Sequence, residues 1–165
     1  MIFLLAVPAV AQTTGDDLLI VPGSGIGRAH LGMPIADVLE IIGPPQPAFS
    51  QVTQQGAAPP STRDRLYYWF TDGGTRTART DSEGRVSMLA VFGDPQFATR
   101  AGLRVGSTQA EVEQNLGAPS RVSSAPASSR SEFAYDTLGI LFFLQGTMPR
   151  VAGIAVFGPG TIARP

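Results

Sequence analysis

Residues 32–45 read GMPIADVLEIIGPP and residues 106–119 read GSTQAEVEQNLGAP, and these two stretches decide the fold class. Five of their 14 positions are identical when the stretches are aligned without gaps. Each begins with glycine, continues with apolar side chains at helical spacing, and ends in glycine with a proline close behind. Glycine and proline commonly follow the last turn of a helix, so each stretch predicts one short helix.

A second pair of matching stretches follows in each half of the chain. Residues 85–93 read RVSMLAVFG and residues 150–158 read RVAGIAVFG, with six of nine positions identical. Both pairs keep the same order, which indicates an internal duplication. The offset of 65 residues between the second pair also aligns Tyr68 with Phe133 and Phe70 with Tyr135. We therefore expect Tyr68 and Phe70 to face the core.

Each half predicts a helix followed by three strands. Strand signals cover residues 66–70, 75–80 and 86–92, and then 133–135, 140–144 and 151–157, with short turns typical of antiparallel hairpins. We expect an α+β fold of two tandem α-β-β-β repeats, residues 12–95 and 96–165, forming one continuous antiparallel sheet with both helices packed on one face. One such unit is marginal alone, so the two are expected to share one domain.

Residue types at the helix ends and in the connections add detail. Thr108 and Glu111 have the spacing of a capping box, and Pro34 lies at the first turn of the other predicted helix. Residues 46–65 and 120–131 are rich in Pro, Ser, Ala and Gln, and predict surface loops.

Composition excludes several classes of function. The 165 residues contain 12 Lys and Arg against 13 Asp and Glu, one His and no Cys. A net charge of −1 argues against a nucleic-acid partner, which would need a positive surface. Without Cys and with a single His, Cys/His zinc sites, iron–sulfur clusters, thiol nucleophiles and disulfides are excluded. We expect no metal, no cofactor and no membrane span, since no segment approaches 18 continuous apolar residues.

Residues 1–11 predict a signal peptide. An apolar run at residues 2–7 is followed by Ala9 and Ala11, which fit the A-x-A rule for cleavage. The run is short and no Lys or Arg precedes it, so we expect the true start to lie upstream. Cleavage would leave Gln12 at the mature terminus, with no Cys there for a lipid anchor. The expected location is periplasmic or secreted; the alternative is an apolar terminus of a cytosolic protein.

Candidate binding residues lie where the two halves differ. Tyr67 and Trp69 alternate with the aromatic residues assigned to the core, and the second half has Glu132 and Ala134 in their places. Because Tyr and Trp dominate binding hot spots, Tyr67 and Trp69 predict a contact surface. The alternative is burial under the loop at residues 46–65.

Two arginines occupy the strand predicted at residues 75–80. The corresponding strand of the second half is apolar throughout, whereas this one alternates Thr with Arg76, Ala and Arg79. One interpretation is an edge strand protected by charge. The other is an anion-binding patch with Arg85 nearby. Together with Tyr67 and Trp69, Arg76 and Arg79 form the predicted binding site.

Acidic residues give no catalytic prediction. Asp72, Asp81, Glu83 and Asp94 all fall in turns, where such residues are common for backbone reasons. No residue is assigned a catalytic role, and we expect the protein not to be an enzyme. The alternative is an envelope hydrolase that uses carboxylates around Asp72 and Asp81.

The pattern Gly-Met-Pro-x-x-x-Val-Leu-x-x-x-Gly-x-Pro at residues 32–45, with aromatic strands behind it, resembles the BamE/SmpA family of small envelope lipoproteins. In tandem it is similar to the β-lactamase inhibitor proteins. The lipidation cysteine of the first family and the disulfides of the second are absent. The resemblance implies a non-catalytic exported module that binds an envelope or secreted protein through a sheet face. A binder of a small ligand, glycan or peptide, in a groove between the units is the alternative.

Overall fold

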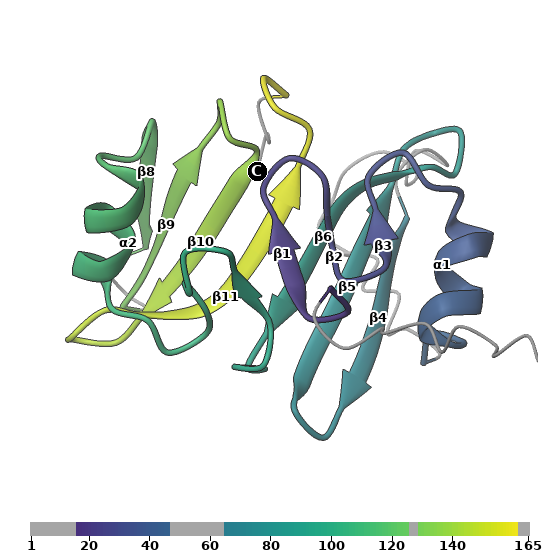
Figure 1. Cartoon of the computed structure of the whole chain (residues 1–165), viewed down its shortest axis with the longest axis horizontal. Coiled ribbons are helices and arrows are strands. Elements are labelled where there is room, and N and C mark those ends of the chain that lie inside the picture. Colours follow the sequence, from purple (N-terminus) through teal and green to yellow (C-terminus); the bar gives the residue numbers. More distant parts are fainter. Residues whose placement is uncertain (1–15, 47–64, 126–128, 162–165) are drawn as a thin grey trace, which may run out of the picture.

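The computed structural model describes residues 16–46, 65–125 and 129–161, which form a mixed α+β fold (Figure 1). Two helices and two sheets of mostly antiparallel strands confirm the predicted class. The predicted signal peptide and residues 47–64 lie outside the described residues. The elements are β1 (Leu19–Val21), β2 (Gly25–Ile26), β3 (Ala29–His30), α1 (Ile35–Ile42), β4 (Leu66–Thr71), β5 (Gly74–Thr80), β6 (Val86–Phe92), β7 (Ala98–Thr99), α2 (Gln109–Leu116), β8 (Arg121–Ala125), β9 (Arg130–Tyr135), β10 (Ile140–Gln145) and β11 (Arg150–Phe157).

The larger sheet has seven strands in the order β4-β5-β6-β11-β10-β9-β8. Every pair of neighbouring strands in this sheet is antiparallel, which is the arrangement that short hairpin connections allow. The two matching stretches found in the sequence form β6 and β11, which lie side by side at the centre. They pair with Ala90 opposite Ala155.

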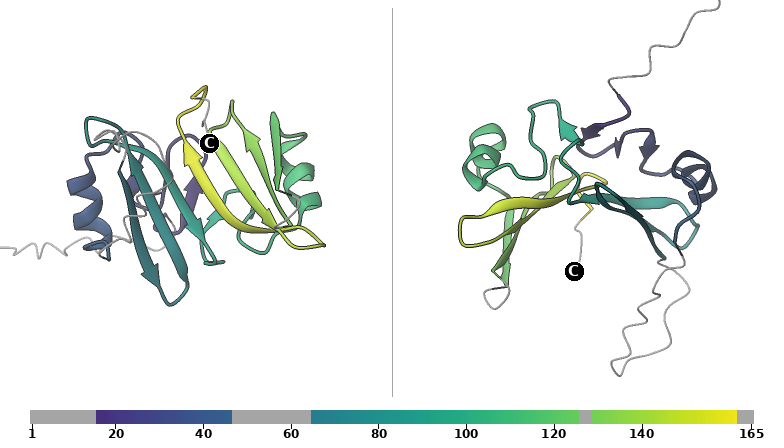
Figure 2. Two further views of the ribbon diagram at one scale, coloured as in Figure 1. Left: turned by 180° about the vertical axis from the view of Figure 1, so that it is seen from behind. Right: turned by 90° about the horizontal axis from the view of Figure 1, so that it is seen from below.

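A second, smaller sheet was not predicted. Its strands run in the order β3-β2-β1-β7, with β1 parallel to β7 and the rest antiparallel. It lies on the same side of the large sheet as both helices, as the edge-on view in Figure 2 shows. The expectation of a single sheet was therefore wrong, because strands of two or three residues leave no readable alternation in a sequence.

The helices begin and end where the sequence predicts. At α2 the Thr108 side chain accepts a hydrogen bond from the Glu111 N–H at 3.2 Å, and the Glu111 carboxylate accepts one from the Thr108 N–H at 2.6 Å. This confirms the capping box. At α1, Pro34 is the residue before the first turn and Gly43 follows the last.

Each helix is tied to a central strand by the same set of contacts. Arg85 donates from Nη1 to the Gly32 carbonyl at 3.1 Å, and Arg150 donates from Nη1 to the Gly106 carbonyl at 2.9 Å. The N–H groups of Gly32 and Gly106 in turn donate to β6 and β11, each over 2.7 Å. The start of each helix is thereby held over the start of its strand.

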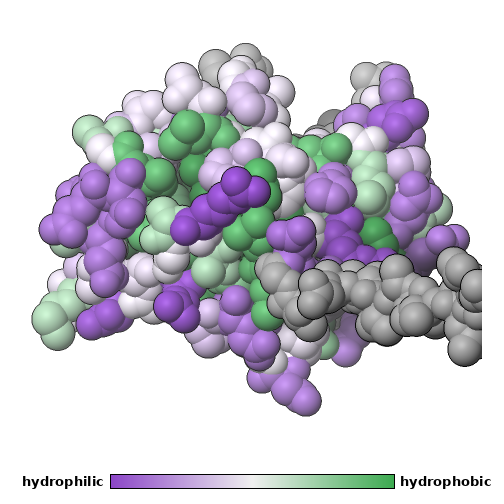
Figure 3. Space-filling view, in the orientation of Figure 1, coloured by the Kyte–Doolittle hydropathy of each residue, from purple (hydrophilic) through white to green (hydrophobic). Residues whose placement is uncertain are grey.

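The main core lies between the large sheet and the layer of helices and small strands. Leu89, Val91, Ile154 and Val156 point into this core, whereas Met88, Phe92 and Phe157 belong to the other face. Both helices contribute an apolar stripe whose central valine is fully buried, Val38 in α1 and Val112 in α2. Hydrophobic and hydrophilic residues are interspersed on the surface of this helix side (Figure 3).

Two predictions about strands were wrong. β5 is not an edge strand, because β4 and β6 flank it, and its Ala78 and Thr80 are buried. Part of the predicted loop at residues 120–131 forms β8, which pairs along its whole length with β9. The Ser-rich composition of that segment concealed an edge strand, since an edge needs apolar side chains on few positions.

Candidate functional site

The four predicted binding residues are divided between the two faces of the large sheet. Tyr67 pairs with Ala78 and Trp69 pairs with Arg76, and these residues lie on the helix side. Arg79 pairs with Met88, on the face that the helices do not cover. We call this second face the open face.

Trp69 is a core residue with a polar anchor. Its side chain is 4% exposed, and its indole N–H donates to the Gly43 carbonyl at the end of α1 over 2.9 Å. Tyr67 stacks on it with ring centroids 6.3 Å apart. The expectation that Trp69 lies on a solvent-side face was therefore wrong. Among the described residues, Trp69 belongs to the main core and contacts the end of α1. Residues 47–64 lie outside the described residues, so burial under that loop stays a prediction.

The error has a physical cause in the hairpin turns. β4 and β5 join through a two-residue turn, with Thr71 opposite Gly74, whereas β9 and β10 join through four residues, with Tyr135 opposite Ile140. The constant offset of 65 residues therefore fails in this hairpin, and a shift of one residue turns every side chain to the other face. Trp69 and Tyr135 correspond, and Tyr68 and Phe70 lie on the open face instead of in the core.

The corresponding aromatic residue of β9 makes the corresponding hydrogen bond. Tyr135 is 4% exposed, and its hydroxyl donates to the Gly117 carbonyl at the end of α2 over 3.0 Å. Burial raises the pKa of the Tyr135 phenol, and the nearby Glu113 carboxylate adds to this effect. A buried aromatic residue therefore joins the sheet to the helix in both halves. Trp69 does so through its indole N–H and Tyr135 through its phenol hydroxyl.

The open face carries two aromatic pairs from three strands. Tyr68 and Phe70 of β4 stack with centroids 6.3 Å apart, and Phe92 of β6 meets Phe143 of β10 at 5.0 Å. Phe70 is 51% exposed, and Phe92 and Phe143 are half-buried. Gly153 in β11 leaves the room that the Phe92 ring occupies, because an added Cβ there would overlap the ring.

The open face is concave and has charged residues around its aromatic centre. Figure 2 shows the large sheet bending away from the helices at both ends, so that this face is hollowed. A shallow cavity of about 310 Å³ lies against Phe92 and Phe143, with Arg130 and Glu132 among its lining residues. Arg79 lies on the β5 side of the same face.

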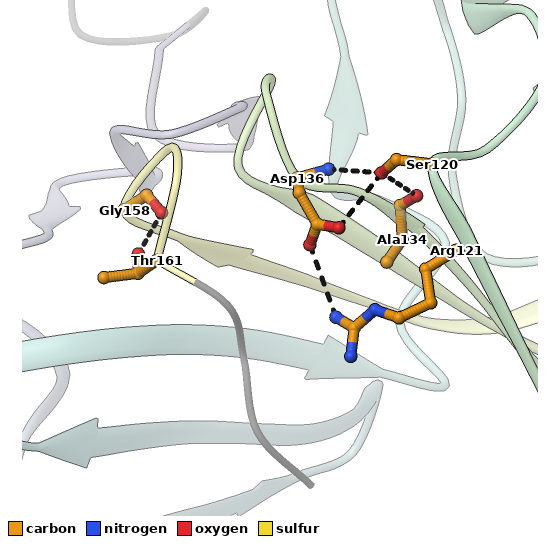
Figure 4. A network of polar contacts seen from close by, with 6 residues as sticks. All are labelled: Ser120, Arg121, Ala134, Asp136, Gly158 and Thr161. Carbon is orange, nitrogen blue, oxygen red and sulfur yellow. Dashed lines mark hydrogen bonds and ion pairs between the residues drawn. The ribbon is translucent and has the colours of Figure 1, made fainter.

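At the β8 edge a polar network holds the sheet together (Figure 4). Arg121 pairs with Asp136 at 3.3 Å, and the Ser120 hydroxyl accepts the Asp136 N–H at 2.8 Å. The same hydroxyl lies 2.8 Å from the Ala134 carbonyl. Three side chains, those of Ser120, Arg121 and Asp136, thus link the start of β8 to the end of β9.

On the helix side, Arg76 is an arginine inside an apolar layer. Its guanidinium lies 3.9 Å from the Asp94 carboxylate and 4.6 Å above the Phe97 ring. Asp94 is 4% exposed and also accepts the Gln96 N–H. Arg85 does not join this group, because it lies at the opposite end of β6 and binds the start of α1. Sequence reasoning missed Asp94, whose position in a turn suggested only a backbone role.

The acidic residues considered for hydrolysis are not brought together. The turns that hold Asp72 and Asp81 lie at opposite ends of β5, whose seven residues span roughly 20 Å at about 3.3 Å each. Asp81 accepts the N–H groups of Glu83 and Arg85, which is a turn-forming role. In the described parts of the chain, no group of three or more His, Asp or Glu side chains could hold a metal ion.

Comparisons with known proteins give one distant likeness. No family model matches the chain, and no curated protein does. No helix among the described residues is long and apolar enough to cross a membrane. Among solved structures, the chain is similar to a DUF4309 family protein (YjgB) from Bacillus subtilis, with 18% sequence identity, a TM-score of 0.46, and coverage of 74% of this chain and 76% of that one.

Proposed function

We propose that this protein is an exported, non-catalytic bacterial binding module that contacts another envelope or secreted protein through the open face. The observation that supports this is the concave sheet face with half-exposed aromatic pairs, Tyr68 with Phe70 and Phe92 with Phe143. Aromatic side chains at the centre and charged ones at the rim are the usual composition of a protein interface.

The contact residues of this proposal differ from the four expected ones. Arg79 remains, because it lies on the open face beside Met88. Trp69 and Tyr67 are replaced by Tyr68 and Phe70, the residues that the observed register turns outward. A partner that fits would present a convex apolar segment, since the surface it meets is hollowed.

We also infer that the chain is a duplicated α-β-β-β unit whose two copies share the large sheet. Support comes from matching contacts in the two halves. Arg85 with Gly32 corresponds to Arg150 with Gly106, and Trp69 with Gly43 corresponds to Tyr135 with Gly117. The helices of both units pack on the same side of the seven-stranded sheet, so among the described residues its other face stays uncovered. The proposal uses that face.

Crosslinking tests the open face against a matched position on the other face. The chain has no Cys, so a single Cys introduced at Phe70 or Val122 carries a benzophenone label uniquely. These side chains are 51% and 55% exposed, and Val122 pairs with Phe133 on the helix side. We expect a partner from an envelope extract of the source organism to crosslink from position 70 and not from position 122.

The crosslinked partner is then purified and its affinity measured. Phe70→Ser and Tyr68→Ser are expected to weaken binding at least tenfold, and Val122→Ser to leave it unchanged, because central aromatic contacts carry most interface energy. Equal crosslinking from both positions, or an affinity unaffected by both aromatic substitutions, would contradict the proposal.

Export is tested separately. We expect the protein recovered from the periplasmic or secreted fraction to begin at Gln12, as determined by N-terminal sequencing. Recovery in the cytosolic fraction with residues 1–11 intact would contradict export and would leave the open face to be judged by crosslinking.

A further inference from the structure

A cavity lies on the helix side of the large sheet, away from the open face. It has a volume of about 190 Å³ and is bounded by α1, the small sheet and the segment that follows β6. Most of its walls are apolar. They include Ile26, Ile41, Ile42, Leu89 and Phe97.

Arg76 brings a cationic group into this apolar cavity. About one third of its side chain is exposed, and its Nε atom is buried with no hydrogen-bond partner in the described structure. Its ion pair with Asp94, at 3.9 Å, is too long for a hydrogen bond. A guanidinium has five N–H donors, and leaving buried donors without acceptors costs free energy. Nε is out of reach of a ligand, but the exposed part of the Arg76 side chain lines the cavity and can donate to an acceptor there.

The fold itself does not require an arginine at this position. Arg76 lies opposite Val91 in the first half, and Ile140 lies opposite Val156 at the corresponding place in the second half. Ile140 is fully buried. A cavity of about 210 Å³ lies beside Ile140, with Leu116 of α2 in its wall. Its one charged lining residue is Arg100, which is exposed in loop 100–103. The guanidinium at the sheet wall is thus particular to the first half.

We propose that the cavity beside Arg76 binds a small aromatic monocarboxylate. The carboxylate would accept paired hydrogen bonds from the Arg76 guanidinium, a geometry that arginine favours. The ring would lie against Ile41, Ile42 and Leu89. An apolar cavity of about 150 Å³ holds one benzene ring, so a volume of about 190 Å³ suits one ring with its acid group.

A second arginine lies at the rim of the cavity. Arg28 and Asp17 also line the cavity, and both side chains are exposed. Asp94 pairs with Arg76 without lining the cavity, so the charges of the two arginines and the two carboxylates balance. The preference for an anion therefore depends on the guanidinium donors of Arg76 and not on a net positive charge.

Titration of the full chain with benzoate tests the proposal. Trp69, the only Trp, lies directly across from Arg76, so its emission reports binding, with calorimetry as a second readout. Benzamide, a neutral molecule of the same shape, is the chemical control. We expect saturable benzoate binding, at least tenfold weaker binding of benzamide, and loss of the preference in Arg76→Ile. Arg100→Ala, at the other cavity, should bind benzoate like the wild type.

Two further arms complete the test. A peptide ending in Phe, with a free or an amidated carboxyl end, distinguishes a chain terminus from a free acid as the source of the ligand group. Arg76→Lys keeps the charge without the paired donors and is expected to bind benzoate with intermediate affinity, which covers the case in which Arg76→Ile does not fold. Equal affinity for benzoate and benzamide, or no saturable binding of either benzoate or the free-carboxyl peptide, would overturn the proposal.

Discussion

The indole N–H of Trp69 donates to the Gly43 carbonyl over 2.9 Å and joins the first strand of the large sheet to the end of α1. Tyr135 makes the same connection to Gly117 at the end of α2, over 3.0 Å. Each hydrogen bond links a buried aromatic ring to the residue at which a helix stops. The same kind of hydrogen bond therefore holds the large sheet to α1 in the first half and to α2 in the second half.

Removing only the hydroxyl of Tyr135 isolates this hydrogen bond. We expect Tyr135→Phe to lower the free energy of unfolding by about 1 kcal/mol, the usual net value of such a bond. Tyr68→Phe is the control, because the Tyr68 hydroxyl has no hydrogen bond to the described residues and its ring lies on the open face. Urea denaturation of both variants gives the two values. An equal effect of the two substitutions would contradict the assigned role.

Stability at alkaline pH depends on the same phenol. Because the pKa of Tyr135 in the folded protein is raised above the ordinary 10.0 by burial, the folded state keeps a proton that the unfolded state releases. Its contribution is complete below pH 10.0 and is lost as the pH rises through the folded pKa. We expect urea midpoints to fall above pH 10.0, and to fall less steeply in Tyr135→Phe. Identical slopes would argue against burial of this phenol.

The capping box of α2 has the opposite dependence on pH. Hydrogen bonds from Thr108 lower the pKa of Glu111 below 4.5, so the ionised carboxylate stabilises the folded state above that pH. This contribution is lost as the pH falls through the lowered folded pKa. Thr108→Ala is expected to cost about 1 kcal/mol at neutral pH and to reduce the loss in acid. Thermal melts at neutral and acid pH measure both effects.

The tight turn between β4 and β5 depends on Gly74. Its φ of +152° is one that L side chains rarely adopt, and a Cβ there would overlap the Phe92 carbonyl oxygen. Gly84 has φ +76° with no atom within 4 Å of a built Cβ. Gly84→Ala should cost about 1–2 kcal/mol from backbone strain alone, and Gly74→Ala clearly more. If Gly74→Ala proves the milder change, the two-residue turn is wrong.

Local chemistry made much of the fold predictable. The spacing of Thr108 and Glu111 predicted the start of α2. The repeated stretches predicted the two strands that lie at the centre of the large sheet. These features depend on neighbours within a few residues, which a sequence shows directly.

The register of β4 depended on a turn length that differs between the halves. The sequence held one indication of the correct register, the apolar residue Ala78 in the middle of β5. If Ala78 points into the core, then Tyr67 opposite it and Trp69 two residues further along β4 point into the core as well. The Arg76–Asp94 pair joins β5 to the segment after β6, and the small sheet joins residues 19–30 to residues 98–99. Such contacts between distant segments have no local pattern.

The orientation of Trp69 underlies both proposals, because it turns Tyr68 and Phe70 to the open face and Arg76 into the cavity. Since the chain has one Trp, acrylamide quenching of the native protein measures that orientation directly. We predict blue-shifted emission and weak quenching, both reversed on unfolding in urea. Emission and quenching in the native protein equal to those of the unfolded chain would place Trp69 in solvent and contradict the register.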